Sequence, residues 1–416
     1  MKPNTKQLVL RLTIALVILP VLTESIYAPC FPLIARSLHV SEAQIQQGFS
    51  WYLLFMAIGP LLWGQISDYS GRRPLVILGM VGFSGGSLLG CYVEHMSDFI
   101  IALCLQAFFG SVICLAQPIN RDVFTTQERV EVSSWIGSIV SVAPAVGALL
   151  GGGFALYGNW RDIFVLLSIA GVVWVIAFAT LLPETKPSTR KFGLSQLLLG
   201  SHAVLTDGNL LGYAALIGLG LGLMYSFFAE GPFYFAQRPQ GGSWFAWICA
   251  LGALSYALGC RYAHRRIESG ISCRSIMTYG LYLQILGSLG MMLWVWFGRQ
   301  FLWNSLWGSS VFFLGIGSCW LIVSVGISML LTPAFALALE HQAEHAGVAG
   351  SWLSGFYNGI TSLSVWGVSQ IGTENLMHMP LYFTCLSVIA CIFLYTLHVQ
   401  GVLCEHSASV PEESFT

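Results

Sequence analysis

The sequence predicts an all-α membrane protein, and the prediction rests on composition and on the length of its apolar runs. Hydrophobic residues make up 56% of the 416 residues, whereas charged residues make up only 9%. A soluble globular protein carries about 25% charged residues, so this chain could not keep a surface of its size in water. Long apolar runs recur from end to end, as expected for a chain that crosses a bilayer repeatedly. The net charge of −1 provides no basic field, so nucleic acid is excluded as a partner.

Twelve apolar segments are long enough to span the bilayer, because a spanning helix needs roughly 20 residues. In the first part of the chain they cover residues 10–35, 44–66, 74–93, 98–119, 132–157 and 161–182. After a polar break they resume at residues 208–235, 243–264, 274–298, 302–335, 346–371 and 379–402. The sequence therefore predicts two pseudo-symmetric halves of six helices, an arrangement that transporters use. The halves are expected over residues 1–183 and 208–402, with a linker over 184–207 and a tail over 403–416.

The positive charges predict how the helices are oriented, because Lys and Arg resist translocation across a membrane. If the N-terminus is cytoplasmic, four of the 18 Lys and Arg residues fall outside, namely Arg36, Arg161, Arg238 and Arg299. The other fourteen fall inside. We therefore expect both termini and the linker to be cytoplasmic, in a monomer held in a bacterial inner membrane.

The loop between the second and third spans carries the strongest motif. It reads Gly64-Gln65-Ile66-Ser67-Asp68-Tyr69-Ser70-Gly71-Arg72-Arg73-Pro74. Two glycines permit a tight turn, while one carboxylate and two guanidiniums can pair and dock on neighbouring helix ends. The loop resembles the GxxxDxxGRR signature of the major facilitator superfamily. The resemblance implies the twelve-helix major facilitator fold, in which Asp68 latches the cytoplasmic side through the start of the eleventh helix.

Two further motifs narrow the resemblance to drug/proton antiporters. The fifth span reads Ala143-Pro144-Ala145-Val146-Gly147-Ala148-Leu149-Leu150-Gly151-Gly152-Gly153, which resembles the GPxxGG-type antiporter signature. There Pro144, Gly147 and Gly151 are expected to bend the helix and pack it against the opposite half. Tyr27-Ala28-Pro29-Cys30-Phe31-Pro32, followed by Ser41 and by Trp51-Tyr52-Leu53-Leu54, is similar to the bicyclomycin-resistance-type branch. Arg121 and Asp122, which end the fourth span, are expected to form a gate pair at the cytoplasmic mouth.

The chain departs from that branch at two positions. The branch usually places an Asp two residues before the residue that is Tyr27 here, but this chain has Ser25 there and the acid is Glu24. A shift of one residue turns a side chain by about 100° around a helix. The fourth-span Arg that the wider family links to proton coupling is also missing, because no Arg occurs from Phe99 to Asn120.

Only two acids, Glu24 and Glu230, lie well inside the predicted spans. An ionisable side chain costs roughly 3 kcal/mol or more near the bilayer centre and is a functional candidate by default. The first and seventh helices are repeat equivalents, so we expect both acids to face a shared central cavity. An apolar environment favours the protonated carboxyl, so we assign Glu24 as the principal proton and substrate site and Glu230 as a second. The alternative for each is a neutral, hydrogen-bonded structural acid.

Polar and aromatic residues are also candidates for that cavity, although each suits packing or interface anchoring as well. They are Tyr27, Trp51, Tyr52, Gln117, Asn120, Tyr225, Tyr234, Tyr357 and Asn358. Together these features predict a secondary active exporter, in which proton entry drives out a drug, metabolite or siderophore.

Two other functions stay open. The first is an uptake carrier or facilitator of the same fold, which the missing Arg keeps open, and the second is a membrane sensor or scaffold without transport. No cofactor is expected beyond a proton gradient as energy source. The chain has no GxxxxGK[ST] loop for ATP and no Cys or His spacing typical of a metal site, so we do not expect an enzyme.

Overall fold

The computed structural model describes six stretches of the chain. They are residues 3–185, 205–237, 241–301, 308–339, 346–372 and 375–399. Every regular element within these stretches is a helix, which confirms the all-α fold class. Most of the predicted linker and the whole predicted tail lie outside the described residues.

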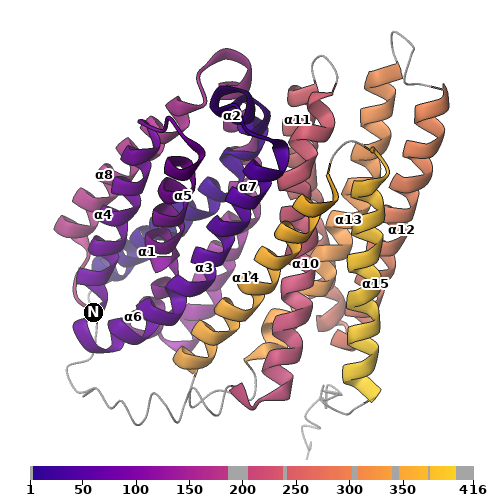
Figure 1. Ribbon diagram of the computed structural model, residues 1–416. Coiled ribbons are helices and arrows are strands. Elements are labelled where there is room, and N and C mark those ends of the chain that lie inside the picture. The colour runs from indigo at the N-terminus through magenta and orange to yellow at the C-terminus, as the bar shows by residue number, and fades with distance from the viewer. Residues whose placement is uncertain are drawn as a thin grey trace, which may run out of the picture.

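The first group of helices forms six crossings (Figure 1). The first crossing consists of α1 (Pro3–Ile26), the short 3₁₀ helix η1 (Ala28–Cys30) and α2 (Phe31–Leu38). The second and third are α3 (Glu42–Ser70) and α4 (Arg72–Gly90). The fourth consists of α5 (Met96–Gly110), the 3₁₀ segment η2 (Ser111–Leu115) and α6 (Ala116–Val123). The fifth and sixth are α7 (Thr126–Tyr157) and α8 (Arg161–Leu181).

The second group also forms six crossings. They are α10 (Gly208–Ala236), α11 (Gly241–Glu268), α12 (Cys273–Phe301), α13 (Gly308–Ala338), α14 (Ala346–Ile371) and α15 (His378–Val399). Figure 1 shows the two groups side by side, with α3 and α7 of the first facing α14 and α11 of the second. Successive helices run in alternate directions. We call the end of the bundle where α1 begins the N-terminus side, and the end that carries α2 the far side.

The helix α14 differs from the other crossings in composition. Eleven crossings in the described residues are both long enough and apolar enough to span a membrane, and α14 is not among them. Its 26 residues suffice in length, but they include polar residues such as Ser351, Asn358, Thr361, Ser362 and Ser369, all of them buried. Its position gives a reason, because α14 packs between α3 and α10 and leaves only a narrow outer face, on which Leu363 and Trp366 are exposed.

The two groups meet along two seams, α3 with α14 and α7 with α11. On the far side, Ser50 of α3 and Ser362 of α14 each donate a hydrogen bond to the other's backbone carbonyl, both at 2.8 Å. Nearer the N-terminus side, a Cβ at Gly355 of α14 would lie 3.0 Å from Leu61 of α3. On the second seam, a Cβ at Gly152 of α7 would lie 2.6 Å from Ala246 of α11. Small residues thus let the helices of the two groups approach closely, as in other membrane bundles.

Candidate functional site

A cavity of about 360 Å³ lies between the two groups of helices. Its walls come from α1, α3, η2, α6 and α7 on one side and from α10, α11, α13 and α14 on the other. The lining residues extend to Gln117 and Phe335, within two turns of the helix ends on the N-terminus side. The far side is closed by the paired serines Ser50 and Ser362 and by the contact of Gly152 with Ala246. The cavity therefore occupies the half of the bundle toward the N-terminus side.

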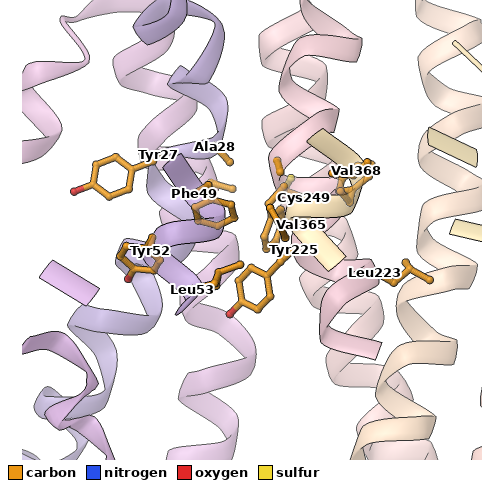
Figure 2. Close-up of a cluster of buried hydrophobic side chains, with 14 of the residues drawn as sticks. Tyr27, Ala28, Phe49, Tyr52, Leu53, Leu223, Tyr225, Cys249, Val365 and Val368 are labelled. Carbon is orange, nitrogen blue, oxygen red and sulfur yellow. The ribbon is translucent and has the colours of Figure 1, made fainter. Parts of the chain in front are cut away.

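Glu24 and Tyr225 join the two groups of helices at the cavity wall. The Tyr225 hydroxyl, on α10, donates a hydrogen bond to Oε2 of Glu24, on α1, and both residues line the cavity. Tyr225 also lies against Phe49 of α3, with ring centroids 6.1 Å apart. Figure 2 shows Tyr225 reaching from its helix toward Phe49 and Leu53. A carboxylate from one half is thus bound by a phenol from the other.

The last turn of α1 explains why Glu24, and not its neighbour, reaches the cavity. The hydroxyls of Thr23 and Ser25 turn back to the carbonyls of Leu19 and Leu22, at 2.7 and 3.1 Å. Ser25 is buried against Gly147 of α7, since a Cβ added to this glycine would meet the Ser25 hydroxyl. The side chain one position earlier, Glu24, therefore points away from α7 and into the cavity. The one-residue shift seen in the sequence thus decides which side chain is available.

The remaining lining residues are mostly apolar and aromatic. Phe228, Tyr256, Trp320, Phe335 and Tyr357 supply rings from four helices of the second group. A weak polar chain runs along α14, in which Asn358 Nδ2 donates to Ser354 Oγ at 3.4 Å and Ser354 Oγ donates to the Tyr357 hydroxyl at 3.3 Å. Glu24 is the one charged side chain among the described residues that line the cavity.

Some of the residues that the sequence singled out come together in this cavity, and others do not. Those that line it are Glu24, Gln117, Tyr225, Tyr357, Asn358 and Pro144. Those that do not are Tyr27, Trp51, Tyr52, Asn120, Tyr234 and Glu230. The sequence missed Tyr256, Trp320 and Ser354, because no local pattern marks which face of each helix turns inward.

Four of the residues outside the cavity have other surroundings. The Tyr27 hydroxyl is buried and donates to Gln106 Oε1 at 2.7 Å, and Gln106 in turn donates to Ser87 at 2.6 Å. Tyr52 is buried and stacks on Phe49. Trp51 is 49% exposed and lies in a shallow apolar groove on the outer surface. Asn120 is buried, and neither atom of its amide has a hydrogen-bond partner.

Glu230 does not share the cavity with Glu24, contrary to the expectation from repeat symmetry. It is 2% exposed, and its Oε2 has no hydrogen-bond partner. Tyr234, one turn further along α10, is 1% exposed and its hydroxyl also lacks a partner. The two acids lie on equivalent helices, but the equivalence does not extend to the direction of the side chain.

The loop between α3 and α4 is a tight turn held by Glu184. Gly71 is its one residue outside the two helices and has φ of +99°, a conformation that favours glycine. The carboxylate of Glu184 accepts hydrogen bonds from the backbone N–H groups of Arg72 at 2.9 Å and Arg73 at 3.2 Å. An anion is thus bound at the start of α4, where the helix dipole favours negative charge. This role for Glu184 was not predicted from the sequence.

The guanidiniums of the same turn reach two neighbouring helices. Arg72 is buried and pairs through Nε with Asp122 of α6 at 3.4 Å, and it also donates to Ser67. Arg73 donates to the carbonyl of Ala179 near the end of α8, at 2.6 Å. Arg121 is exposed. The expected gate pair of Arg121 with Asp122 is therefore wrong, because Asp122 turns inward to Arg72.

The glycines of α7 pack mainly on their own half. A Cβ on Gly151 would meet the backbone carbonyl of Ile26 in α1, and Gly147 faces Ser25 of the same helix. The sequence predicted that these glycines would pack against the opposite half. Gly152 does so at Ala246, whereas Gly147 and Gly151 contact α1 of their own half. Gly64 of α3 faces Ser351 of α14 across the seam. The Asp68 side chain lies outside the described residues.

Comparisons with known proteins agree with this architecture. The family model of the Major Facilitator Superfamily matches residues 13–365. An uncharacterized transporter of Rickettsia bellii is 26% identical, covering 90% of this chain and 93% of its own length. A bicyclomycin resistance protein homolog of Haemophilus influenzae is 23% identical, over 92% of this chain and 95% of its own. Multidrug resistance protein D of Escherichia coli is 27% identical, over 86% and 87%.

A solved structure adds a likeness in fold alone. The crystal structure of a D-xylose–proton symporter superposes with a TM-score of 0.71 at 13% sequence identity, covering 95% of this chain and 98% of that one.

Proposed function

The chain belongs to the Major Facilitator Superfamily, and on that premise we propose that it is a proton-driven exporter of small organic molecules. The relatives named for bicyclomycin resistance and multidrug resistance support the branch that the first-span motif indicated. They favour export over the uptake carrier or facilitator of the same fold. Transport would proceed by alternating access, with the two groups of helices rocking about the cavity between them.

The observation that carries the proposal is the contact between Glu24 and Tyr225. A phenol donates a stronger hydrogen bond to an ionised carboxylate than to a neutral carboxyl. The bond between the two halves therefore tightens when Glu24 loses its proton and weakens when Glu24 gains one. A proton that enters the cavity thus changes both the charge of the site and the connection between the halves.

Exchange of proton and substrate follows from competition for one carboxylate. A substrate that donates a hydrogen bond, or carries a positive charge, binds best when Glu24 is ionised. A proton arriving from the other side of the membrane neutralises Glu24 and releases that substrate. The missing fourth-span Arg fits this scheme, because no Lys, Arg or His occurs among the described lining residues. The acid has no fixed cation that would hold it ionised.

The cavity favours neutral or cationic amphipathic molecules. A volume of about 360 Å³ falls within the usual range of ligand pockets, roughly 300–1,000 Å³. The rings of Tyr256 and Trp320 provide apolar surface and faces that attract cations. An anionic siderophore would be repelled by Glu24, and no Lys, Arg or His among the described lining residues would offset that repulsion. Drugs and metabolites without negative charge are therefore the better candidates.

The direction of the cavity follows from the charge asymmetry of the loops. Of the 13 Lys and Arg residues that the structure describes, ten lie on the N-terminus side, so we place that side in the cytoplasm of a bacterium. The conformation is then inward-facing, with the far side closed toward the outside. In this state a substrate reaches Glu24 from the cytoplasm.

The test uses purified protein reconstituted in vesicles with an imposed pH gradient. A thermal-stabilisation screen of neutral, cationic and anionic compounds first selects the transported probe. We expect Glu24→Gln to reduce proton flux driven by that probe roughly ten- to a hundredfold, because a hydrogen bond to a charged group contributes about 1.5–3 kcal/mol.

The matched control is Glu268→Gln, which changes an exposed acid at the end of α11. It should transport like the wild type. The unfolding temperature of Glu24→Gln must also match the wild type, so that loss of folding is not mistaken for loss of coupling. Normal gradient-driven export by a folded Glu24→Gln protein would refute the assignment of Glu24.

A further inference from the structure

A second buried acid lies outside the cavity with unpaired polar groups along the same helix. Ser226, Glu230 and Tyr234 follow one another at intervals of four residues on α10, so they share one face of it. Their exposed fractions are 0%, 2% and 1%. The Ser226 hydroxyl, Glu230 Oε2 and the Tyr234 hydroxyl each have no hydrogen-bond partner. A buried polar group without a partner destabilises the fold, so three on one face need a reason.

The charged and titratable neighbours of Glu230 come from three helices. They are Glu42 at the start of α3, Tyr234 of α10 and Tyr382 of α15. The Tyr382 hydroxyl already donates to the carbonyl of Ser364 in α14, at 2.6 Å. No base among the described residues pairs with Glu230. With no base beside it, a Glu230 carboxylate would be neutralised by binding a proton.

A pocket at the far side lies one helical turn along α10 from this acid, although Glu230 itself does not line it. It has a volume of about 670 Å³ and lies between α2, the start of α3 and the end of α10. Arg36, His39, Glu42, Phe233 and Gln237 are among its lining residues. Phe233 is one turn beyond Glu230 on the same helix, and Glu42, which also lines the pocket, is the nearby acid named above. The cavity that contains Glu24 extends instead toward the N-terminus side.

We propose that Glu230 is a second proton-binding site, separate from the substrate cavity, which takes up its proton through the pocket on the far side. The reaction is the transfer of one proton from hydronium in the pocket to the Glu230 carboxylate, which leaves water and a neutral carboxyl, with the Ser226 and Tyr234 hydroxyls as nearby donors and acceptors. This inference rests on the proposed function, in which protons enter from the far side. It means that Glu230 can bind a proton from the far side while the substrate cavity is open toward the N-terminus side.

The test reads protonation directly and needs no transported compound. Infrared difference spectra of the purified protein, taken between pH 5 and pH 9, report carboxyl groups that gain a proton. We expect one pH-dependent carboxyl band that disappears in Glu230→Gln and a different one that disappears in Glu24→Gln. Glu42→Gln removes a nearby acid at the pocket rim and should retain the Glu230 band. If the spectra contain no pH-dependent band that Glu230→Gln removes, Glu230 is a permanently neutral structural acid and the proposal fails.

The route is tested with a plug in each opening. Gln237→Cys, in the far-side pocket, and Gln117→Cys, in the cavity, are labelled with the same bulky maleimide before a rapid pH jump. We expect the Gln237 label to delay the Glu230 band and the Gln117 label to delay the Glu24 band. If only the Gln117 label delays the Glu230 band, or neither label does, the far-side route is wrong.

Wild-type protein treated with the same maleimide corrects for native cysteines, of which Cys114 and Cys249 line the cavity. Failure of the proposed function can be told apart from failure of this inference. A Glu24→Gln protein that exports normally refutes the former and leaves the Glu230 band untouched.

Discussion

Lys6 and Glu128 join the first and fifth crossings at the N-terminus side of the bundle. The Lys6 ammonium donates to both carboxylate oxygens of Glu128 at 2.7 Å. The same carboxylate accepts the backbone N–H of Thr125 at 2.8 Å and so caps the start of α7. Glu128 thus fixes both the beginning of its own helix and the position of that helix against α1.

This pair gives a pH dependence that can be measured. The hydrogen bonds from Lys6 and from the Thr125 backbone lower the pKa of Glu128 from 4.5 to about 2. A lowered folded-state pKa stabilises the fold above pH 4.5, and that contribution is lost as the pH falls from 4.5 toward 2. We expect Glu128→Gln to unfold at a lower temperature than the wild type at pH 7, and the difference to shrink at pH 3.

The exposed Glu94 provides the control, because Glu94→Gln should track the wild type at both pH values. A Glu128→Gln deficit of the same size at pH 7 and pH 3 would contradict the interpretation, since it would come from packing and not from charge. Glutamine can still cap the helix, so the comparison isolates the charge.

The direction of single side chains is the part that the sequence could not provide. Trp51 and Tyr52 are adjacent, yet one is 49% exposed and the other 1%, because successive residues point about 100° apart on a helix. A membrane helix is apolar all round, so no polar stripe marks the side that faces a cavity. Glu24 was found because a charge in such a helix is rare, whereas Tyr256 and Trp320 resemble any other interface aromatic.

The helix α7 shows how small residues set the distance between two elements. Gly151 brings α7 against the end of α1, and its carbonyl accepts a hydrogen bond from the Cys30 thiol at 3.4 Å. A Cβ at position 151 would meet the backbone carbonyl carbon of Ile26 at 3.0 Å and Pro29 Cδ at 3.1 Å. Backbone cannot rotate aside as a side chain can, so one of the two helices would have to move. That movement would disturb the last turn of α1, which carries Glu24.

We therefore expect Gly151→Ala to destabilise the protein by about 1–3 kcal/mol, the usual cost of overpacking. Thermal unfolding in detergent measures the effect. Gly153→Ala, two residues further along the same helix, is the matched control because nothing lies within 4 Å of its Cβ. Equal unfolding temperatures for the two variants would show that α1 and α7 can separate without cost.

The positions of the helices were predicted closely from the apolar runs and from the polar segments between them. The spans predicted over 44–66 and 161–182 correspond to α3 (Glu42–Ser70) and α8 (Arg161–Leu181). Proline removes a backbone donor, so Pro29 predicts a bend or break in the first span, and η1 separates α1 from α2 there. The 3₁₀ segment η2 of the fourth crossing lies before Pro118, where a bend is predicted for the same reason, and it packs against α3 and α4.

The two seams determine how the whole molecule can move. On the far side, α3 and α14 are bonded by Ser50 and Ser362, whose hydroxyl oxygens lie 3.1 Å apart. Opening the far side to release a substrate requires these two helices to separate there or to slide. The buried position of the pair, 6% and 5% exposed, means that water replaces both hydrogen bonds when the seam opens.

A disulfide at this point should hold the molecule in the state whose cavity extends toward the N-terminus side. In Ser50→Cys/Ser362→Cys the two side chains fall within the range of a disulfide. We expect oxidation to abolish export of the probe selected by the stabilisation screen, and dithiothreitol to restore it. The two single-cysteine variants, which retain the native cysteines, should lose no activity on oxidation. Full transport by protein that mass spectrometry shows to be cross-linked would mean that this seam is a hinge that stays closed throughout the cycle.

The composition of α14 also affects how the protein is made. A nascent helix enters the membrane from the translocon according to its own apolarity, and α14 is the crossing that falls short by that measure. Its partners α3 and α10 are synthesised earlier, so they are already in place when α14 leaves the ribosome. We expect α14 to insert against the surfaces that these helices present, and not on its own. On this expectation, the seam between α3 and α14 guides assembly of the second half against the first.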